Sequence, residues 1–196
     1  MMSRKQLGFH INLERCNGCL TCQIACKDKN DLPMGCLYRQ VHEIAGGGYT
    51  EVNNVVKANV FAYWIPMSCN HCKDPMCVKN CPTGAMQKRP EDGIVFVDQS
   101  KCIGCQYCVW SCPYDAPQYD PDKGKTGKCD LCKDLLSQGE QPACVAACPM
   151  RALDFGPMEE LKQKYGGVER VKGLPEPNLT KPSLLITPHR DAAPGK

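Results

Sequence analysis

Cysteines arranged in tight groups constrain this chain more than any other feature of its sequence. Of its 196 residues, 17 are Cys, and all but Cys36 fall in four groups of four. An odd count, and a first stretch (MMSRKQLGFH) without an apolar export segment, argue against a disulfide framework. We therefore expect the thiols to bind metal, and we expect no signal peptide. In chain order the groups, named A, B, A′ and B′, are Cys16, Cys19, Cys22 and Cys26; Cys69, Cys72, Cys77 and Cys81; Cys102, Cys105, Cys108 and Cys112; and Cys129, Cys132, Cys144 and Cys148.

The spacing within the groups is typical of iron–sulfur ligation. Groups A and A′ both read CxxCxxCxxxC, the run that binds a 4Fe-4S cluster in bacterial ferredoxins, and groups B, A′ and B′ end in Cys-Pro as that run does. Thiolate sulfur is the soft ligand that such clusters select. A zinc site needs only paired CxxC units and has no use for a third cysteine two residues further on. Sixteen cysteines are enough for four 4Fe-4S clusters, which is our prediction.

The chain is an internal duplication. CNGCLTCQIAC at 16–26 aligns with CIGCQYCVWSC at 102–112, and the segment 69–85 aligns with 129–152 if the second copy carries an insertion. The shared glycine (Gly18, Gly104) lets the backbone close tightly around a cluster. Because the fourth cysteine of such a run ligates the neighbouring cluster in two-cluster ferredoxins, the groups must associate in pairs. Pairing B with A′ leaves A with B′. Pairing A with B, and A′ with B′, is topologically simpler, and the residues alone leave both arrangements open.

If B pairs with A′, the behaviour of the fourth cysteine assigns every ligand to one cluster. The inner unit then holds two clusters, with ligands Cys69, Cys72, Cys77 and Cys112, and Cys81, Cys102, Cys105 and Cys108. The outer unit holds two more, with ligands Cys16, Cys19, Cys22 and Cys148, and Cys26, Cys129, Cys132 and Cys144.

The segments between the groups suit an α+β fold. Residues 8–13, 60–65 and 93–98 are rich in β-forming residues, RPEDG at 89–93 is a turn signal, and residues 158–166 predict a helix. We expect two interleaved bacterial ferredoxin-like units built around the four clusters. The apolar run SLLITP near the C-terminus favours an arm packed on this chain or on a partner over a disordered tail. The expected division is 1–59, the first half of the outer unit with a connecting insertion; 60–118, the inner unit; 119–165, the second half of the outer unit; and 166–196, an extended C-terminal arm.

Charge and composition exclude several functions. The formal net charge of +3 counts cysteines as neutral, whereas sixteen thiolates and four cubane cores of about +2 each change it by −16 + 8 = −8, to about −5. A basic surface for nucleic acid is therefore not expected. No stretch approaches the roughly 18 apolar residues needed to span a bilayer. Since sixteen ligands saturate four cubanes and no nucleophile–base pattern stands out, we expect electron transfer and no catalysis by this subunit itself.

Four other residues, a histidine, the remaining cysteine and two tryptophans, are not expected to bind iron. We expect His71, inside a cluster loop, to be a polar loop residue beside a cluster, and Cys36 to be a buried or incidental thiol. Trp64 and Trp110 are expected to be packing residues. Only 7% of the residues are aromatic, so cluster ligation should supply a large share of the folding free energy, and the cluster-free chain should be poorly folded.

The spacer sequences resemble a known family. VFAYWIPMSCNHCKDPMC, GAMQKRPEDGIVFVD, CPYDAPQYD, KCDLC and CPMRALDFGPMEEL make the chain similar, over residues 7–190, to the iron–sulfur subunits of dimethyl sulfoxide reductase. The cysteine framework alone is shared with subunits of formate dehydrogenase, nitrate reductase, polysulfide reductase and tetrathionate reductase. The resemblance favours pairing the first group with the fourth and the second with the third. All four cysteines of group A′ are present, whereas nitrate reductase relatives have a tryptophan there and a 3Fe-4S centre, so the resemblance also implies four 4Fe-4S clusters.

The resemblance implies partners that the residues do not show. Such subunits lie between a catalytic subunit carrying a molybdenum bis-pterin guanine dinucleotide cofactor and a membrane anchor that oxidises quinol. The clusters would pass electrons from quinol to molybdenum, where dimethyl sulfoxide and related S- or N-oxides are reduced. Membrane association would come through these partners, on the cytoplasmic or the exported face. The alternatives are an equivalent subunit of a polysulfide, tetrathionate or formate enzyme, and a soluble polyferredoxin without a fixed partner.

Overall fold

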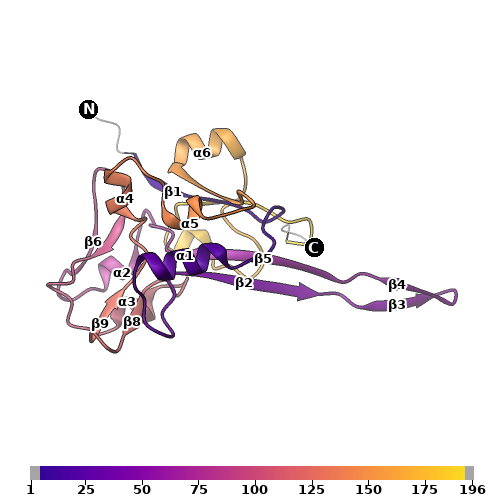
Figure 1. The fold of residues 1–196 in the computed structure, drawn as a ribbon, viewed down its shortest axis with the longest axis horizontal. Coiled ribbons are helices and arrows are strands. Elements are labelled where there is room, and N and C mark those ends of the chain that lie inside the picture. The colour runs from indigo at the N-terminus through magenta and orange to yellow at the C-terminus, as the bar shows by residue number, and fades with distance from the viewer. Residues whose placement is uncertain (1–4, 193–196) are drawn as a thin grey trace.

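Short helices and small β-sheets make up a mixed α/β fold in the computed structural model, which describes residues 5–192 (Figure 1). Residues 1–4 and 193–196, at the outer ends of the first and last expected segments, lie outside the described residues. The helices are α1 (Thr21–Lys29), α2 (Met76–Lys79), α3 (Tyr107–Ser111), α4 (Lys133–Ser137), α5 (Ala143–Ala146), α6 (Met158–Tyr165) and the 3₁₀ turn η1 (Pro177–Leu179). The strands are β1 (Leu7–Asn12), β2 (Arg39–Gly46), β3 (Tyr49–Val52), β4 (Val55–Ala58), β5 (Phe61–Ser68), β6 (Met86–Lys88), β7 (Val95–Val97), β8 (Gln118–Asp120), β9 (Lys125–Gly127), β10 (Leu153–Pro157) and β11 (Leu184–Thr187).

Five predictions of local structure are confirmed. The β-forming runs at 8–13, 60–65 and 93–98 overlap β1, β5 and β7, and α6 forms within the segment 158–166. The turn at 89–93 connects β6 to β7 in an antiparallel hairpin. Acidic residues in the first turn of α6 and lysines in its last turn suit the helix dipole, which explains why this short segment is helical.

A three-stranded sheet of order β10-β1-β11 lies at the centre of the largest core. Its middle strand, β1, pairs antiparallel with β10 and parallel with β11, so the last described strand lies beside the first. Phe9, Ile11, Leu184 and Ile186 are almost completely buried in this sheet. Helix α6 packs against all three strands. Because both faces of β1 are covered, His10 is buried as well as its apolar neighbours.

A long hairpin projects from the body of the molecule (Figure 1). Strand β2 pairs antiparallel with β5, and the same hairpin continues outward as β3 and β4. At its tip, Asn53 and Asn54 have φ values of 54° and 58°, as a two-residue type I′ turn requires. Every residue of β3 and β4 is exposed. The hairpin occupies much of the segment expected as a connecting insertion, and its strands before residue 60 were not predicted.

The cysteine loops repeat in conformation as well as in sequence. Gly18 and Gly104 have φ values of 71° and 70°, and Leu20 and Gln106, the residues before α1 and α3, both have a φ of 62°. These left-handed residues turn the chain twice within each loop, so the helix begins directly after the second cysteine. Helix α1 packs against α5, and α2 packs against α3. This packing places group A beside group B′ and group B beside group A′.

Candidate iron–sulfur sites

One cavity lies between the first loop and the end of the fourth cysteine group. The pKa of Cys22 is raised to about 11, chiefly by burial; Arg39 opposes this rise, and the neighbouring thiols of Cys144, Cys16 and Cys148 contribute to it. Such mutual repulsion between thiolates is relieved when iron binds them. The cysteines lining the cavity are Cys16, Cys19, Cys22 and Cys148.

A second cavity lies between groups B and A′. The loop before α3 supplies two of its cysteines and α3 supplies a third, while the fourth comes from the turn after α2. This cavity repeats the composition of the first, with three cysteines from one group and the last cysteine of another group. The cysteines lining it are Cys102, Cys105, Cys108 and Cys81.

A third set of thiols is gathered where group B meets the end of group A′. Burial raises the pKa of Cys77 to about 12, and the nearby thiols of Cys69, Cys112 and Cys72 add to the rise. Burial also raises the pKa of Cys72 to about 12, again with contributions from Cys69 and Cys112. The four side chains therefore lie close enough to interact electrostatically.

A fourth set is gathered where group B′ meets the end of α1. The pKa of Cys26 is raised to about 12, chiefly by burial and also by the thiols of Cys144 and Cys132. The thiol of Cys129 is completely buried, and its pKa is raised by burial first and then by Cys69, Cys26 and Cys144. Cys129 thus belongs with the fourth set and also faces Cys69 of the third.

No single-ion site accompanies these sets. Among residues 5–192, no three His, Cys, Asp or Glu side chains converge as ligands of one metal ion would. A zinc site requires such convergence on one point. A cubane instead takes one thiolate at each of four irons, so its ligands surround a cluster at a distance from one another.

Backbone amides prepare several thiols to carry negative charge. Leu131 N–H donates to Cys129 Sγ at 3.4 Å, and Ala152 N–H donates to Cys148 Sγ at 3.3 Å. Hydrogen bonds to the charged form of a sulfur favour that form, and they raise the reduction potential of a bound cluster. The amides that donate to Cys81 and Cys102 belong to Met86 (3.3 Å) and Thr126 (3.5 Å). The donor set therefore fits iron–sulfur clusters.

The two loop glycines are required by their neighbours as well as by their backbone conformation. A Cβ on Gly18 would lie 2.5 Å from Nε1 of Trp64, and a Cβ on Gly104 would overlap the carbonyl oxygen of Gly124. From the sequence, these glycines were expected because they let the backbone close tightly around a cluster. In the structure, each glycine also lets another part of the protein close over the loop. Trp64 is therefore a packing residue, as expected, and its Nε1 donates to Glu43 Oε2 at 3.1 Å.

Arg39 is a buried cation that the sequence analysis missed. Its guanidinium is 1% exposed, Nη1 donates to the carbonyl oxygen of Pro66 at 2.6 Å, and its Cζ lies 4.7 Å from the ring centroid of Phe9. Nε and Nη2 have no hydrogen-bond partner among the described residues. Cys144 and Cys22 are among the groups whose negative charge would stabilise this cation. An uncompensated buried charge is costly, so a negatively charged cluster beside Arg39 fits the site.

Three more residues can now be placed. His71 lies in a cysteine loop beside a candidate ligand, as expected, but it is also completely buried, and burial lowers its pKa well below the usual range. Lys128, which was also missed, is 5% exposed, and its only sequence signal was its position directly before Cys129. Cys36 is buried, as predicted, and its Sγ donates to the carbonyl oxygen of Tyr119 at 3.4 Å.

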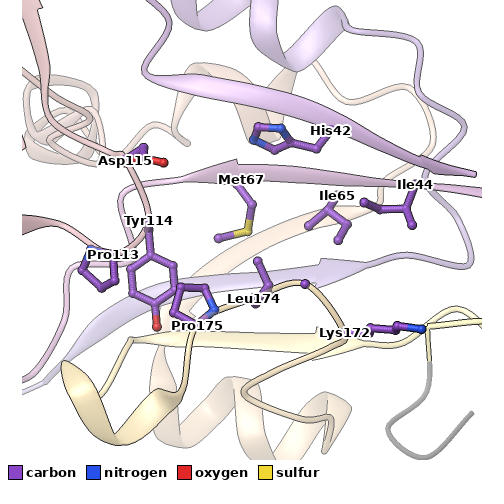
Figure 2. A pocket seen from close by; sticks show the side chains of 11 residues that line it. His42, Ile44, Ile65, Met67, Pro113, Tyr114, Asp115, Lys172, Leu174 and Pro175 are labelled. Atoms are coloured by element: carbon purple, nitrogen blue, oxygen red, sulfur yellow. The ribbon is translucent and has the colours of Figure 1, made fainter.

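A separate apolar groove lies beside the base of the long hairpin (Figure 2). Ile44 and Ile65 reach it from β2 and β5, and Leu174 and Pro175 come from the segment after α6. No cysteine lines this groove. The groove is therefore not one of the candidate cluster sites.

Four thiol sets on short loops with amide donors define a ferredoxin-type iron–sulfur protein. In agreement, residues 60–158 match the family described as a 4Fe-4S dicluster domain. The protein is 51% identical to the B subunit of anaerobic dimethyl sulfoxide reductase from Escherichia coli K12, over 96% of this sequence and 92% of that one. It is 48% identical to the corresponding subunit from Haemophilus influenzae, with the same coverage, and 37% identical to the B subunit of polysulfide reductase from Wolinella succinogenes, over 95% and 96%.

The chain therefore belongs to the family of dimethyl sulfoxide reductase iron–sulfur subunits. These are electron-transfer subunits of reductase complexes and are not catalytic by themselves. Within residues 5–192, no helix has the length and apolar character needed to cross a membrane.

Proposed function

We propose that this chain relays electrons through four 4Fe-4S clusters. The electrons come from a quinol-oxidising membrane anchor subunit and go to a catalytic subunit with a molybdenum bis-pterin guanine dinucleotide cofactor. That subunit would reduce dimethyl sulfoxide and related S- or N-oxides. The observation that carries the proposal is that two separate cavities are each lined by four cysteines from two different groups, in a member of this family.

The proposed ligand sets follow the four gatherings of thiols. We name the clusters by their place along the proposed path, from the first cavity to the second. Cluster 1 has ligands Cys16, Cys19, Cys22 and Cys148; cluster 2 has Cys26, Cys129, Cys132 and Cys144; cluster 3 has Cys69, Cys72, Cys77 and Cys112; and cluster 4 has Cys81, Cys102, Cys105 and Cys108.

Neighbouring thiols support this linear order. Cys22 and Cys26 lie one turn apart on α1, which joins clusters 1 and 2. Cys129 interacts with Cys69, which joins clusters 2 and 3. Clusters 3 and 4 are joined by α2 and α3, because each helix carries one ligand and is followed by a ligand of the neighbouring cluster. Electrons would therefore enter and leave at clusters 1 and 4.

Apolar side chains at the surface mark both ends of this path. Leu20 and Met150, which line the cluster 1 cavity, are each 43% exposed. Beside cluster 4, Ile103 is 65% exposed and Trp110 is 72% exposed. Trp110 is thus not a packing residue within this chain, and that prediction was wrong. Exposed apolar groups next to an electron entry or exit point are suited to contact partner subunits.

The test is anaerobic purification of the protein with whatever binds it. Iron, acid-labile sulfide and molybdenum are measured, and the clusters are followed by an EPR redox titration. We expect about 16 iron per chain, four 4Fe-4S signals and molybdenum in a larger copurifying subunit. Zinc in place of iron would overturn the proposal. Four clusters without a stable partner would favour a polyferredoxin, and activity with polysulfide, tetrathionate or formate instead of dimethyl sulfoxide would identify another enzyme type.

A further inference from the structure

We propose that His71 and Lys128 form a crossed pair of contacts between clusters 2 and 3 and raise the reduction potentials of both. The inference rests on the ligand sets of the proposed function. It concerns the step in which one electron leaves one of these clusters and enters the other, without any bond being made or broken. Both residues act on cluster ligands, so they are positioning residues and not ligands themselves.

The two contacts cross between the cysteine groups. His71 lies in the loop between Cys69 and Cys72, both ligands of cluster 3, but its Nε2 is 3.8 Å from Cys129 Sγ of cluster 2. Lys128 directly precedes Cys129, but its Nζ donates to Cys69 Sγ of cluster 3 at 3.4 Å. Each residue therefore belongs to the loop of one cluster and contacts a ligand of the other.

The hydrogen bonds of His71 determine its tautomer. The backbone N–H of Val95 donates to Nδ1 at 3.0 Å, so Nδ1 acts as an acceptor and carries no proton. The proton of the neutral ring must then be on Nε2, the nitrogen that faces Cys129 Sγ. The contact is therefore an N–H donor directed at a cluster sulfur.

The hydrogen bonds of Lys128 require its charged form. Its Nζ donates to Cys69 Sγ at 3.4 Å, to the carbonyl oxygen of Cys129 at 2.7 Å and to the carbonyl oxygen of Val95. An ammonium group has three N–H donors and a neutral amine has two, so three acceptors match the ammonium. This places a full positive charge beside a ligand of cluster 3, in the interior of the protein.

One residue holds both contacts in place. The N–H of Val95 binds His71 and its carbonyl oxygen binds Lys128. Val95 lies in β7, is 1% exposed, and pairs with Lys88 of β6. The two donors are thus fixed relative to each other by a buried strand, as a tuned electron-transfer step requires.

The His71–Lys128 pair lies at the one junction between neighbouring clusters where the proposed ligand sets exchange no cysteine. Between clusters 1 and 2, and between clusters 3 and 4, exchanged fourth cysteines connect the neighbours covalently through short helices. Between clusters 2 and 3 the proposed sets contain no exchanged cysteine, and the contacts between the two loops are those of His71 with Cys129 and of Lys128 with Cys69. A donor or a positive charge beside a cluster sulfur stabilises the reduced, more negative cluster and so raises its potential.

The experiment measures midpoint potentials in the purified complex by EPR redox titration, with iron content as a second readout. We expect Lys128→Met to lower the potential of cluster 3 more than those of clusters 1 and 4. We expect His71→Phe, which keeps an aromatic ring but has no donor, to lower the potential of cluster 2. Lys128→Arg keeps the charge and His71→Gln keeps an N–H donor, so both should restore much of the shift. Cys69→Ser and Cys129→Ser identify which signal belongs to which cluster.

Lys57→Met is the matched control, because it removes the same charge from the exposed strand β4 and should move none of the potentials. Unchanged potentials in fully loaded Lys128→Met and His71→Phe complexes would overturn the inference, as would equal shifts of all four clusters. If the Lys128→Met complex contains too little iron for its potentials to be measured, the His71→Phe complex becomes the test. An unchanged cluster 2 potential in that complex overturns the inference as well. A wild-type complex that lacks four reducible clusters would instead overturn the proposed function.

Discussion

Buried cations are the residues that most clearly link this protein's interior to its clusters. Arg39 and Lys128 are 1% and 5% exposed, and the groups that would compensate their charges are mainly cysteine sulfurs. A buried charge costs several kcal/mol unless it is paired. In this protein the pairing partners are sulfurs that become formally negative when they bind iron. The cations and the proposed clusters therefore stabilise each other.

Gly18→Ala and Gly104→Ala should each reduce cluster loading. A left-handed backbone costs a residue with a Cβ about 1–2 kcal/mol, and here the new Cβ also meets Trp64 or the Gly124 carbonyl. We expect the iron content of the purified protein to fall by about one cluster for each substitution. Gly35→Ala is the matched control, because Gly35 has a φ of 85° but no atom lies within 4 Å of the position that a Cβ would take there. Equal iron loss in all three variants would show that backbone strain alone is responsible.

His10 should make stability depend on pH. Burial lowers its pKa from 6.5 to about 4, an effect that Lys164 and Arg15 reinforce and Asp154 opposes. The folded protein thus favours the neutral ring, and the unfolded state binds more protons between these values. The stabilising contribution is complete above about pH 6.5 and is lost as the pH falls toward about 4.

The measurement is the anaerobic thermal unfolding midpoint at about pH 7 and about pH 5. Wild-type protein should lose more stability between these pH values than His10→Gln, which cannot titrate. His42→Gln on the exposed part of β2 removes the same kind of group from outside the core, and it should retain the wild-type pH dependence. An equal pH dependence in His10→Gln and wild type would exclude His10 as the cause.

Among the elements, the long hairpin is the one whose outer half is not needed for the core. Since every residue of β3 and β4 is exposed, residues 49–58 can be replaced by an Asn-Gly turn between Gly48 and Asn59. These two residues already pair, because Asn59 N–H donates to the Gly48 carbonyl oxygen at 2.9 Å. We expect the shortened protein to keep its full iron content and its visible absorption spectrum.

Ile65→Ala, at the buried base of the same hairpin, should destabilise the protein, whereas shortening the exposed tip should not. Ile65 lies in β5 and is 3% exposed, so its truncation should cost about 2–5 kcal/mol of unfolding free energy and lower the thermal midpoint. Loss of iron on shortening the tip would contradict the prediction, because it would mean that the exposed strands support the cluster loops.

The elements also differ in how readily their sequences predict them. Runs of β-forming residues predicted β1, β5 and β7, and the helix-forming residues of 158–166 predicted α6. The tip hairpin had a signal that went unused, since Asn53-Asn54 between β-branched residues is a type I′ turn. Strands β6, β8 and β9 have three residues each, as β7 does, but only β7 lies within a longer run of β-forming residues, at 93–98.

At the scale of the whole molecule, removal of the clusters should abolish the fold. The largest core contains Cys22, Cys69, Cys129, Cys144 and Cys148 among its buried residues, so much of it lies beside the proposed clusters. Without ligation these thiols would surround unfilled cavities, and apolar packing alone would not hold them together. After anaerobic chelation of iron we expect the near-UV circular dichroism to be lost and amide hydrogen exchange to become fast. A cluster-free protein that keeps slow exchange in β1 and β11 would show that the three-stranded sheet folds independently.

The sequence by itself determined the class of protein, and tertiary structure decided how the parts meet. Spacings such as CxxCxxCxxxC act within one loop, where short chain length fixes which sulfurs can face one cluster, so they can be read directly from the residues. Contacts between distant residues leave no such trace. That His71 faces Cys129, that Lys128 faces Cys69, and that β11 pairs in parallel with β1 all depend on packing between segments more than 50 residues apart. The same limit explains why Arg39 was missed, since its significance comes only from being buried among thiols of groups A and B′, which are far apart in the sequence.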